Sequence, residues 1–307
     1  MEFFDIHTHT VHSDGKHDVA YVLTAGQQEG LSVLSITDHN SVGTYKELRD
    51  PSLRSKFGGK ILPGVEINTV YKGTIIEILG YGFCSEKMID RLPKHVYSFR
   101  EKQLREAAVN LKAFRRAGVV MDQAFCQTME TAPEALFDPS RETGKFAFLK
   151  EIKKHPENAR FFGGTEKMQQ TEFSTFFRKM MCDKNHPLFV DQSVLFPTID
   201  EVVGLIHDCG GLAFMAHPYQ YVPMIMEEIE NILQQYPLDG LEAYYYDFTE
   251  QQVHTICDIC QKHNLYVSGG SDFHGLALRP NRIGYGAGKN RLPIHIIKPW
   301  LSKVNFI

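Results

Sequence analysis

The sequence predicts an α/β fold built on a parallel sheet, open or closed into a barrel, with a mainly helical insert in the middle of the chain. Three observations support this class. Short apolar runs alternate with helical patterns, His and carboxylate residues recur at the ends of those runs, and one long central stretch breaks the alternation. The 307 residues, of which 43% are hydrophobic, are enough for one large domain with an insert and a sizeable core.

Short apolar runs have the length and composition of strands. They span residues 3–8, 32–37, 61–67, 74–80, 212–216, 241–245 and 265–269. Helical patterns lie between several of them, and two of these begin with a capping box, at Thr198 with Glu201 and at Thr249 with Gln252. Such alternation of strands and helices is typical of a parallel sheet.

Residues 97–191 break the alternation. They are rich in charge and in phenylalanine and carry a net charge of +3, whereas the rest of the chain carries −7. We therefore expect residues 1–96 and 192–307 to form one β/α domain, and residues 97–191 to form a helical insert or cap. The phenylalanines are expected to form the insert's own small core, although such rings can also stack on a nucleotide base.

Composition excludes several classes of protein. The net charge of −4 does not indicate a polyanion-binding protein, and the six cysteines form no dense secreted framework. Cys257 and Cys260 have CxxC spacing but lie on one face of a helical pattern, so core packing is expected, with redox or metal binding as the alternative. The chain shows no signal peptide and no apolar run of about 18 residues, which predicts a cytoplasmic protein without a membrane span.

Histidines and carboxylates fall at or near the ends of the predicted strands. His7 and His9 are two apart on the first strand, so both rings point to the same face. The second strand runs into His39, and the fifth ends at His217. The complete set of candidate ligands is His7, His9, Asp14, His39, Glu66, Glu77, His217, Asp272 and His274.

These side chains are predicted to bind metal. In a parallel α/β barrel the carboxyl ends of the strands meet at one mouth, and buried imidazoles and carboxylates are costly there unless they are paired or bound to metal. Mixed His and carboxylate ligands suit Mn, Fe or Zn better than Mg or Ca, so we predict a cluster of such divalent cations. Taken singly the residues allow other interpretations: an HxH pair can be structural, and Glu77 can be an exposed residue of an edge strand.

The motifs around these residues resemble the PHP (polymerase and histidinol phosphatase) family of metal-dependent phosphoesterases. They occur in family order as His7-Thr8-His9, Ser13-Asp14-Gly15, Thr37-Asp38-His39-Asn40, Gly64-Val65-Glu66, Ala216-His217-Pro218 and Ser271-Asp272-Phe273-His274-Gly275. The insert and residues 268–274 are similar to the branch of nucleoside 3′,5′-bisphosphate phosphatases and 5′-to-3′ exoribonucleases. The resemblance implies a distorted seven-stranded, TIM-like β/α barrel and a trinuclear metal centre, so two to three divalent cations are expected.

The family pattern also implies how the ligands are shared. One ion would be held by His7, His9, Glu66 and Asp272, a second by bridging Glu66 with His217 and the residue at position 77, and a third by Asp14, His39 and His274. Many members of the branch have His at position 77, where this chain has Glu77. In the insert, Thr143-Gly144-Lys145-Phe146 loosely matches an Arg-Pro-His element of the branch, with Lys145 in place of Arg.

The resemblance implies a metal-dependent phosphoric monoester hydrolase that uses a metal-activated hydroxide. The expected partner is a small phosphorylated substrate, a nucleoside 3′,5′-bisphosphate or a short 5′-phosphorylated oligonucleotide, with no membrane or stable protein partner implied. The residues expected to act through the bound metals are His7, His9, Glu66, His217, Asp272 and His274. The candidates for binding substrate are Lys145, His186 and Arg279, and the alternative for each is a solvated surface residue.

Other functions stay open at this point. A histidinol-phosphate phosphatase would keep the mechanism and change the substrate, and a non-catalytic metal-binding PHP module would be expected to have lost ligand residues. A metal-dependent amidohydrolase also begins with HxH on a barrel strand, but it usually places a single Asp on the last strand, where this chain has both Asp272 and His274. The insert and the nearly complete ligand set favour a nucleotide phosphoesterase.

Overall fold

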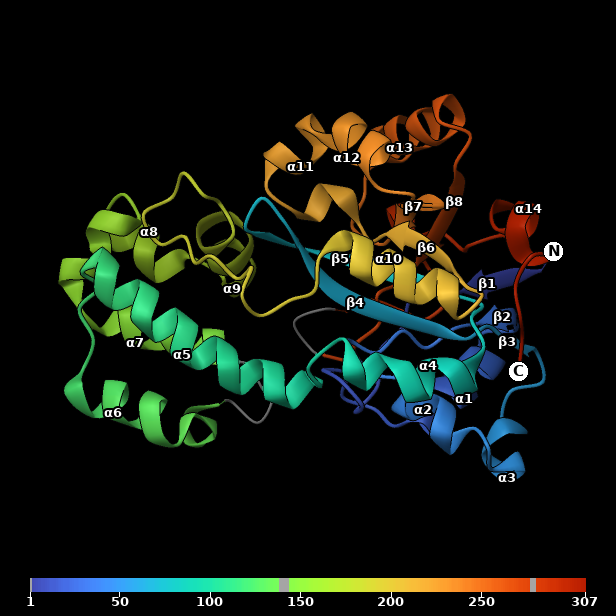
Figure 1. Ribbon diagram of the computed structural model, residues 1–307, viewed down its shortest axis with the longest axis horizontal. Coiled ribbons are helices and arrows are strands. Elements are labelled where there is room, and N and C mark those ends of the chain that lie inside the picture. The colour runs from blue at the N-terminus through green and yellow to red at the C-terminus, as the bar shows by residue number, and fades with distance from the viewer. Residues whose placement is uncertain (1, 138–143, 277–279) are drawn as a thin grey trace.

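The structure is a computed structural model, which describes residues 2–137, 144–276 and 280–307 (Figure 1). It confirms the predicted α/β class. The strands are β1 (Phe3–Asp5), β2 (Leu31–Leu34), β3 (Lys60–Ile61), β4 (Gly64–Tyr71), β5 (Thr74–Tyr81), β6 (Leu212–Met215), β7 (Gly240–Tyr245) and β8 (Tyr266–Gly270). They form a 3-stranded sheet in the order β1-β2-β3 and a 5-stranded sheet in the order β4-β5-β6-β7-β8.

Isolated bridges connect the two sheets. A parallel bridge joins Thr8, just after β1, to Phe273, just after β8, and another joins His39, after β2, to Glu66 within β4. Both bridges lie at residues next to or among the candidate ligands. The seven-stranded barrel is nevertheless not confirmed, because the described strands divide into sheets of 3 and 5.

Strand β5 departs from the expected parallel arrangement, since it runs antiparallel to both β4 and β6. A two-residue hairpin loop causes the reversal: Lys72 (φ 49°) and Gly73 (φ 82°) are both left-handed, as the tightest hairpin turns require. Asn68 and Glu77 are cross-strand partners in this hairpin. Glu77 therefore lies in the middle of an antiparallel strand, and the expectation of a parallel sheet around it is wrong.

Helices cover the sheets on two sides, with α1–α4 on one and α11–α13 on the other (Figure 1). The capping boxes predicted at Thr198 and Thr249 are confirmed, and they begin α10 and α13. The α-helices outside the insert are α1 (Val19–Gln28), α2 (Gly43–Glu47), α3 (Pro51–Arg54), α4 (Ser85–Arg91), α10 (Ile199–Asp208), α11 (Pro223–Glu227), α12 (Ile229–Gln235), α13 (Glu250–Lys262) and α14 (Lys298–Leu301). Short 3₁₀ segments are η1 (Leu92–Lys94), η5 (Pro218–Gln220), η6 (Ala287–Lys289) and η7 (Ile294–Ile296).

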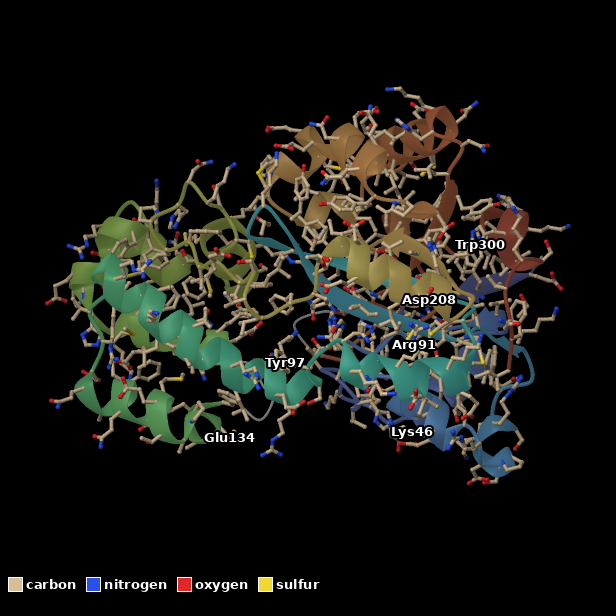
Figure 2. The ribbon with its side chains drawn as sticks, viewed as in Figure 1. Lys46, Arg91, Tyr97, Glu134, Asp208 and Trp300 are labelled. Atoms are coloured by element: carbon tan, nitrogen blue, oxygen red, sulfur yellow. The ribbon has the colours of Figure 1, made fainter. Side chains whose placement is uncertain are left out.

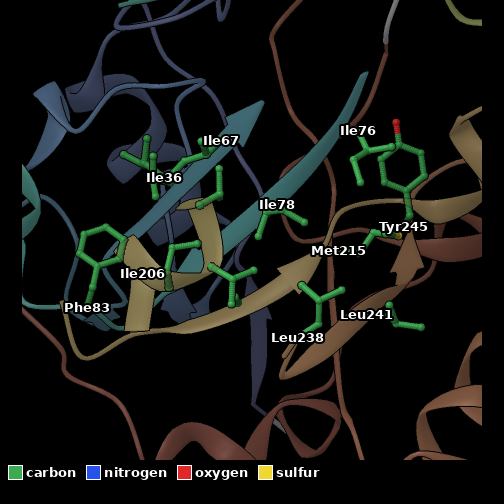
Figure 3. Close-up of a cluster of buried hydrophobic side chains, with 14 of the residues drawn as sticks. Ile36, Ile67, Ile76, Ile78, Phe83, Ile206, Met215, Leu238, Leu241 and Tyr245 are labelled. Carbon is green, nitrogen blue, oxygen red and sulfur yellow. The ribbon is translucent and has the colours of Figure 1, made fainter. Parts of the chain in front are cut away.

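The main core lies between the strands and the helices of the two sides (Figure 3). Ile76 and Ile78 of β5 and Ile206 of α10 are fully buried in it, and each such side chain contributes about 1.5–3 kcal/mol on burial. Cys257 and Cys260 pack against or within this core from α13, which supports their assignment to packing. All six cysteines are free thiols.

Helices of the central stretch lie together beside the sheets, at the end of the molecule opposite both termini (Figure 1). They are α5 (Phe99–Ala117), α6 (Gln123–Thr131), α7 (Gly144–Lys154), α8 (Thr165–Gln170), α9 (Phe173–Thr175), 3₁₀ segments η2 (Pro133–Leu136) and η3 (Pro156–Phe161), and the π-helical turn η4 (Phe176–Met181). A second hydrophobic cluster is made of residues from this stretch alone, with Phe114, Phe148 and Phe176 fully buried. The phenylalanines thus form a core of their own.

Long-range contacts tie outer helices to each other and to the sheet (Figure 2). Arg91 of α4 forms an ion pair with Asp208 of α10 at 2.6 Å, and the Trp300 indole donates to the Val267 carbonyl at 3.0 Å. Tyr97 lies at the start of α5, where the chain leaves the sheets for the insert helices (Figure 2). Within the described residues, none of the helices has the length and apolar character to cross a membrane.

Candidate metal centre

The predicted ligands converge, and each of them contacts at least one other. Two of them follow β1: His7 Nε2 lies 3.3 Å from Glu66 Oε2 and 3.4 Å from Asp272 Oδ1, and His9 Nε2 lies 3.4 Å and 3.1 Å from the same two atoms. His7, His9 and Glu66 are fully buried. Together with Asp272, these three residues are the set that the resemblance to the PHP family implies for one ion.

A second group lies next to the first. His274 Nε2 is 3.1 Å from Asp14 Oδ1, and His39 Nε2 is 3.7 Å from Asp14 Oδ2. The rings of His9 and His274 stack with their centroids 4.2 Å apart. His9, Asp14, His39 and His274 each place a donor atom within 4.8 Å of one another, a spacing that one cation could bridge.

A third group surrounds the antiparallel strand β5. His217 Nε2 lies 3.1 Å from Glu66 Oε1 and 3.5 Å from Glu77 Oε2, and His39 Nδ1 lies 3.2 Å from Glu66 Oε2. Glu66 thus contacts imidazoles from three different segments through its two oxygens. A carboxylate in this position is suited to bridging neighbouring cations.

The backbone is strained where these segments meet. His217 (φ 25°) and Asp272 (φ 51°) follow the ends of β6 and β8 in left-handed conformations, which cost about 1–3 kcal/mol each in residues other than glycine. Gly270 is required at the end of β8, because a Cβ there would lie 2.2 Å from the Cβ of His7. Strain and close approach both serve to bring the ends of β1, β6 and β8 together.

The residues present fit a divalent cation cluster. Neither ring nitrogen of His9 makes a hydrogen bond of good geometry within the described residues, although the ring is fully buried, and Asp14 Oδ1 is likewise buried without one. Without a cation between them, carboxylates packed this closely would repel one another, and buried ring nitrogens would lack a partner. Such ligands suit Mn, Fe or Zn.

The metal-free site shifts the pKa values of its residues in opposite directions. Burial lowers the pKa of His9 to about 4, with a further contribution from His274. Burial, followed by the charge of Glu77, raises the pKa of Glu66 to about 8. Burial would lower the pKa of His7, but the carboxylates of Glu242, Glu66 and Asp272 raise it well above its usual value. Protons therefore compete with cations for this site.

Two residues that the sequence analysis missed orient the ligands from behind. Glu242 of β7 is fully buried; its Oε1 lies 2.8 Å from His7 Nδ1, and its Oε2 accepts the His217 backbone N–H at 2.9 Å. Tyr245 donates its hydroxyl to Asp272 Oδ2 at 2.9 Å. A lone Glu within an apolar run, at 241–245, was the available signal for a buried carboxylate.

Buried aspartates also shape the site without facing the ligand cluster. Asp38 accepts from the Thr10 backbone and hydroxyl at 2.7 Å each and from Ser13 Oγ at 2.9 Å, which holds the loop that carries Asp14. Asp5 accepts from the backbone N–H groups of Ser271 and Gly284, and its burial raises its pKa to about 6.

The predicted substrate residues are placed differently. Lys145 is buried, with its ammonium 2.7 Å from Glu106 Oε2. His186 accepts the Leu188 backbone N–H at 3.1 Å inside the insert. Among the described residues, neither side chain contacts the ligand set, and Arg279 lies outside those residues. His12 pairs with Glu47 at 2.6 Å, away from the cluster.

Comparisons with known proteins point to one class. The phosphoribosyl 1,2-cyclic phosphate 1,2-diphosphodiesterase of Eggerthella lenta is 23% identical over 92% of this chain and 97% of its own length. The 5′-3′ exoribonuclease Rnm of Escherichia coli is 24% identical (88% and 85% covered), and the 3′,5′-nucleoside bisphosphate phosphatase of Chromobacterium violaceum is 25% identical (89% and 88% covered). No family model matches the chain.

Solved structures share the fold. A Bifidobacterium adolescentis protein assigned as a metal-dependent phosphoesterase aligns with a TM-score of 0.62 at 19% identity, covering 99% of this chain and 96% of its own. A Chromobacterium violaceum protein described as an amidohydrolase aligns with a TM-score of 0.66 at 20% identity, covering 98% and 96%. At these identities the structures show the fold alone. The curated relatives confirm the predicted resemblance and the expectation of a phosphoester hydrolase.

Proposed function

We propose that this chain is a metal-dependent phosphomonoesterase acting on nucleotides, with 3′,5′-bisphosphates or short 5′-phosphorylated oligonucleotides as substrates. The convergence of imidazoles and carboxylates on Glu66 carries the proposal. We assign cation binding to His7, His9, Asp14, His39, Glu66, Glu77, His217, Asp272 and His274, in the grouping given by the family pattern.

The protein's own hydrogen bonds prepare the imidazoles as ligands. Glu242 accepts from His7 Nδ1, so His7 Nε2, which faces Glu66 and Asp272, is the nitrogen that would bind a cation in place of its proton. His274 Nδ1 lies 2.9 Å from the Asp272 carbonyl oxygen, which only accepts, so His274 Nε2 presents its lone pair toward Asp14. Both imidazoles therefore direct Nε2 to the cluster.

The charge of the site suits phosphate. Bound divalent cations supply Lewis acidity and lower the pKa of coordinated water toward about 7. The carboxylates of Asp14, Glu66, Glu77 and Asp272 do not fully neutralise three divalent cations, so the loaded site keeps a positive charge that attracts a phosphate dianion. Burial of the ligands strengthens this attraction, because the effective dielectric there is lower than in water.

The insert is the proposed source of substrate contacts. We propose that residues 97–191 act as a cap over the mouth, as the net charge of +3 suggests for an anionic substrate. Lys145 and His186 remain the proposed contacts within the described part of the insert. The names of the bisphosphate phosphatase and exoribonuclease relatives support nucleotides as the substrate class. The free cysteines support a reducing, cytoplasmic location.

The test is phosphate release in the presence of Mn²⁺ from adenosine 3′,5′-bisphosphate, a 5′-phosphorylated oligoribonucleotide, histidinol phosphate and p-nitrophenyl phosphate. The controls are a chelator-treated sample, a His9→Ala variant, and His254→Ala, which changes an exposed histidine of α13. We expect chelator-sensitive release from the bisphosphate or oligonucleotide, lost in His9→Ala and kept in His254→Ala. Preference for histidinol phosphate would replace the substrate, and bound metal without any turnover would contradict the enzymatic proposal.

A further inference from the structure

A chain of hydrogen bonds connects the insert to the candidate ligand at position 77. Lys102, on α5, donates its ammonium to Asn68 Oδ1 at 2.8 Å, and Asn68 Nδ2 donates to Glu77 Oε1 at 2.9 Å. The other Glu77 oxygen, Oε2, lies 3.5 Å from His217 Nε2. Three segments far apart in the sequence thus meet through one carboxamide.

The orientation of that carboxamide follows from its donors. Asn68 Oδ1 accepts from Asn40 Nδ2 at 3.1 Å as well as from Lys102, so two N–H groups face the oxygen. The Asn68 NH₂ group must then face Glu77, which accepts. Asn40 directly follows His39, and its Oδ1 accepts the Asn68 backbone N–H at 3.0 Å, which fixes the position of Asn68.

Lys102 is buried to an extent that is unusual for a lysine. It is 5% exposed and its partner Asn68 is 3% exposed, and burying an ammonium group is costly without compensating contacts. Glu106, one helical turn further along α5, has an ion pair with Lys145 at 2.7 Å. Lys102, Glu106 and Lys145 together therefore carry one net positive charge beside the acidic cluster. Burial lowers the pKa of Lys102, while the charges of Glu106, Glu77 and Asp14 oppose that shift.

We propose that Lys102 is a positioning residue for the metal centre, which acts through Asn68 to hold the Glu77 carboxylate against His217. The inference rests on the proposed function, because it assumes that Glu77 and His217 share a cation. It gives the insert a role in the cation site in addition to any contact with substrate. It also accounts for a Glu at position 77, since the positive charge of Lys102 offsets the charge that Glu adds to Asp14, Glu66 and Asp272.

The direct test is cation affinity. The full-length protein is stripped with chelator and dialysed against a series of free Mn²⁺ concentrations, and the Mn content per chain is measured for wild type, Lys102→Met and Asn68→Ala. Lys112→Met, an exposed lysine on the same helix, is the matched control. We expect one class of Mn²⁺ to bind about 10–100-fold more weakly in Lys102→Met and Asn68→Ala, and Lys112→Met to match wild type.

A second comparison separates positioning from general packing. In a Glu77→His background the imidazole needs neither a counter-charge nor the Asn68 donor, so Lys102→Met is expected to change Mn²⁺ affinity by no more than about twofold there. Lys102→Arg, which keeps the charge, is expected to restore part of the affinity in the Glu77 background.

The outcomes are distinct. An equal loss of affinity in both backgrounds, or unchanged affinity in a folded Lys102→Met protein, would overturn the inference. If Lys102→Met does not fold, Asn68→Ala provides the test, because it breaks the link from Lys102 to Glu77 and keeps the Lys102 charge. Unchanged Mn²⁺ affinity in Asn68→Ala would also refute the inference. Failure of the wild type to bind Mn²⁺ would instead overturn the proposed function.

Discussion

Replacing Glu242 by glutamine should move the proton on His7 while leaving the shape of the site unchanged. In the native protein Glu242 Oε1 lies 2.8 Å from His7 Nδ1, and Oε2 accepts the His217 backbone N–H at 2.9 Å. A carboxylate only accepts, so His7 keeps a hydrogen on Nδ1, and Nε2 is the nitrogen that can bind a cation once its own proton is released.

In Glu242→Gln the carboxamide oxygen must keep facing the His217 N–H, because that group only donates. The NH₂ group then faces His7 Nδ1, which has to accept, and the hydrogen of His7 moves to Nε2, 3.3 Å from Glu66 Oε2. That hydrogen occupies the side from which a cation would be held. Loss of such an orienting carboxylate costs about 10–100-fold in metal affinity, which corresponds to about 1.4–2.8 kcal/mol.

The assay is Mn²⁺ binding to chelator-stripped protein, followed by calorimetry at constant pH, with circular dichroism to verify the fold. Glu227→Gln, an exposed position on α11, is the matched control and should bind as wild type does. An affinity within about twofold of wild type in a folded Glu242→Gln protein would refute the assignment of His7 Nε2 as a ligand atom.

Four further predictions follow from the same structure. Glu66, with its pKa raised to about 8, is protonated below that pH in the metal-free protein, so a cation must displace its proton. Mn²⁺ affinity should therefore fall as the pH decreases below 8, by about tenfold per pH unit for each proton released. An Mn²⁺ affinity that stays constant in dialysis between pH 6 and 9 would contradict this. Gly270→Ala should lower the melting temperature and the Mn content because its Cβ would meet His7, whereas Gly204→Ala on α10, with open space around it, should do neither. Chelator should lower the melting temperature, since a cation at 100 times its Kd adds about 2.7 kcal/mol per site; identical melting curves with and without chelator would exclude tight binding. Lys145→Met should destabilise the fold in urea by about 3–5 kcal/mol because it leaves Glu106 buried without its partner, and unchanged stability in urea would contradict this reasoning.

Most of the candidate ligands could be proposed from the sequence because they lie in short local motifs. The HxH just beyond the first strand and the Asp272–His274 pair just beyond the last strand each place two candidate ligands two residues apart in one short segment. Convergence at one mouth followed from the parallel strands. Glu77 is placed differently, by the side-chain alternation of an antiparallel strand that follows a hairpin turn. The sequence signals this turn weakly, because Lys72-Gly73 is not a strong turn dipeptide.

The supporting residues were not accessible in the same way. Glu242 and Lys102 have no motif, and their roles depend on which side chain happens to lie opposite them after folding. Glu242 contacts His7 across 235 positions of sequence, and Lys102 contacts Asn68 across 34. A pattern based on nearest neighbours along the chain carries no information on such pairs. The division of the strands into two sheets likewise depends on which strands pair after folding.

The bridge between Thr8 and Phe273 has a consequence for how the protein is made. The amino-terminal ligands emerge from the ribosome long before their partners, and closing a loop of this length brings a large loss of chain entropy before any contact is gained. Cation loading must then wait until nearly the whole polypeptide has been synthesised. Metal binding by a nascent chain at the proposed site of His7, His9, Glu66 and Asp272 would thus report completion of the fold rather than its beginning, and a chain shortened before Asp272 would lack one ligand of that set.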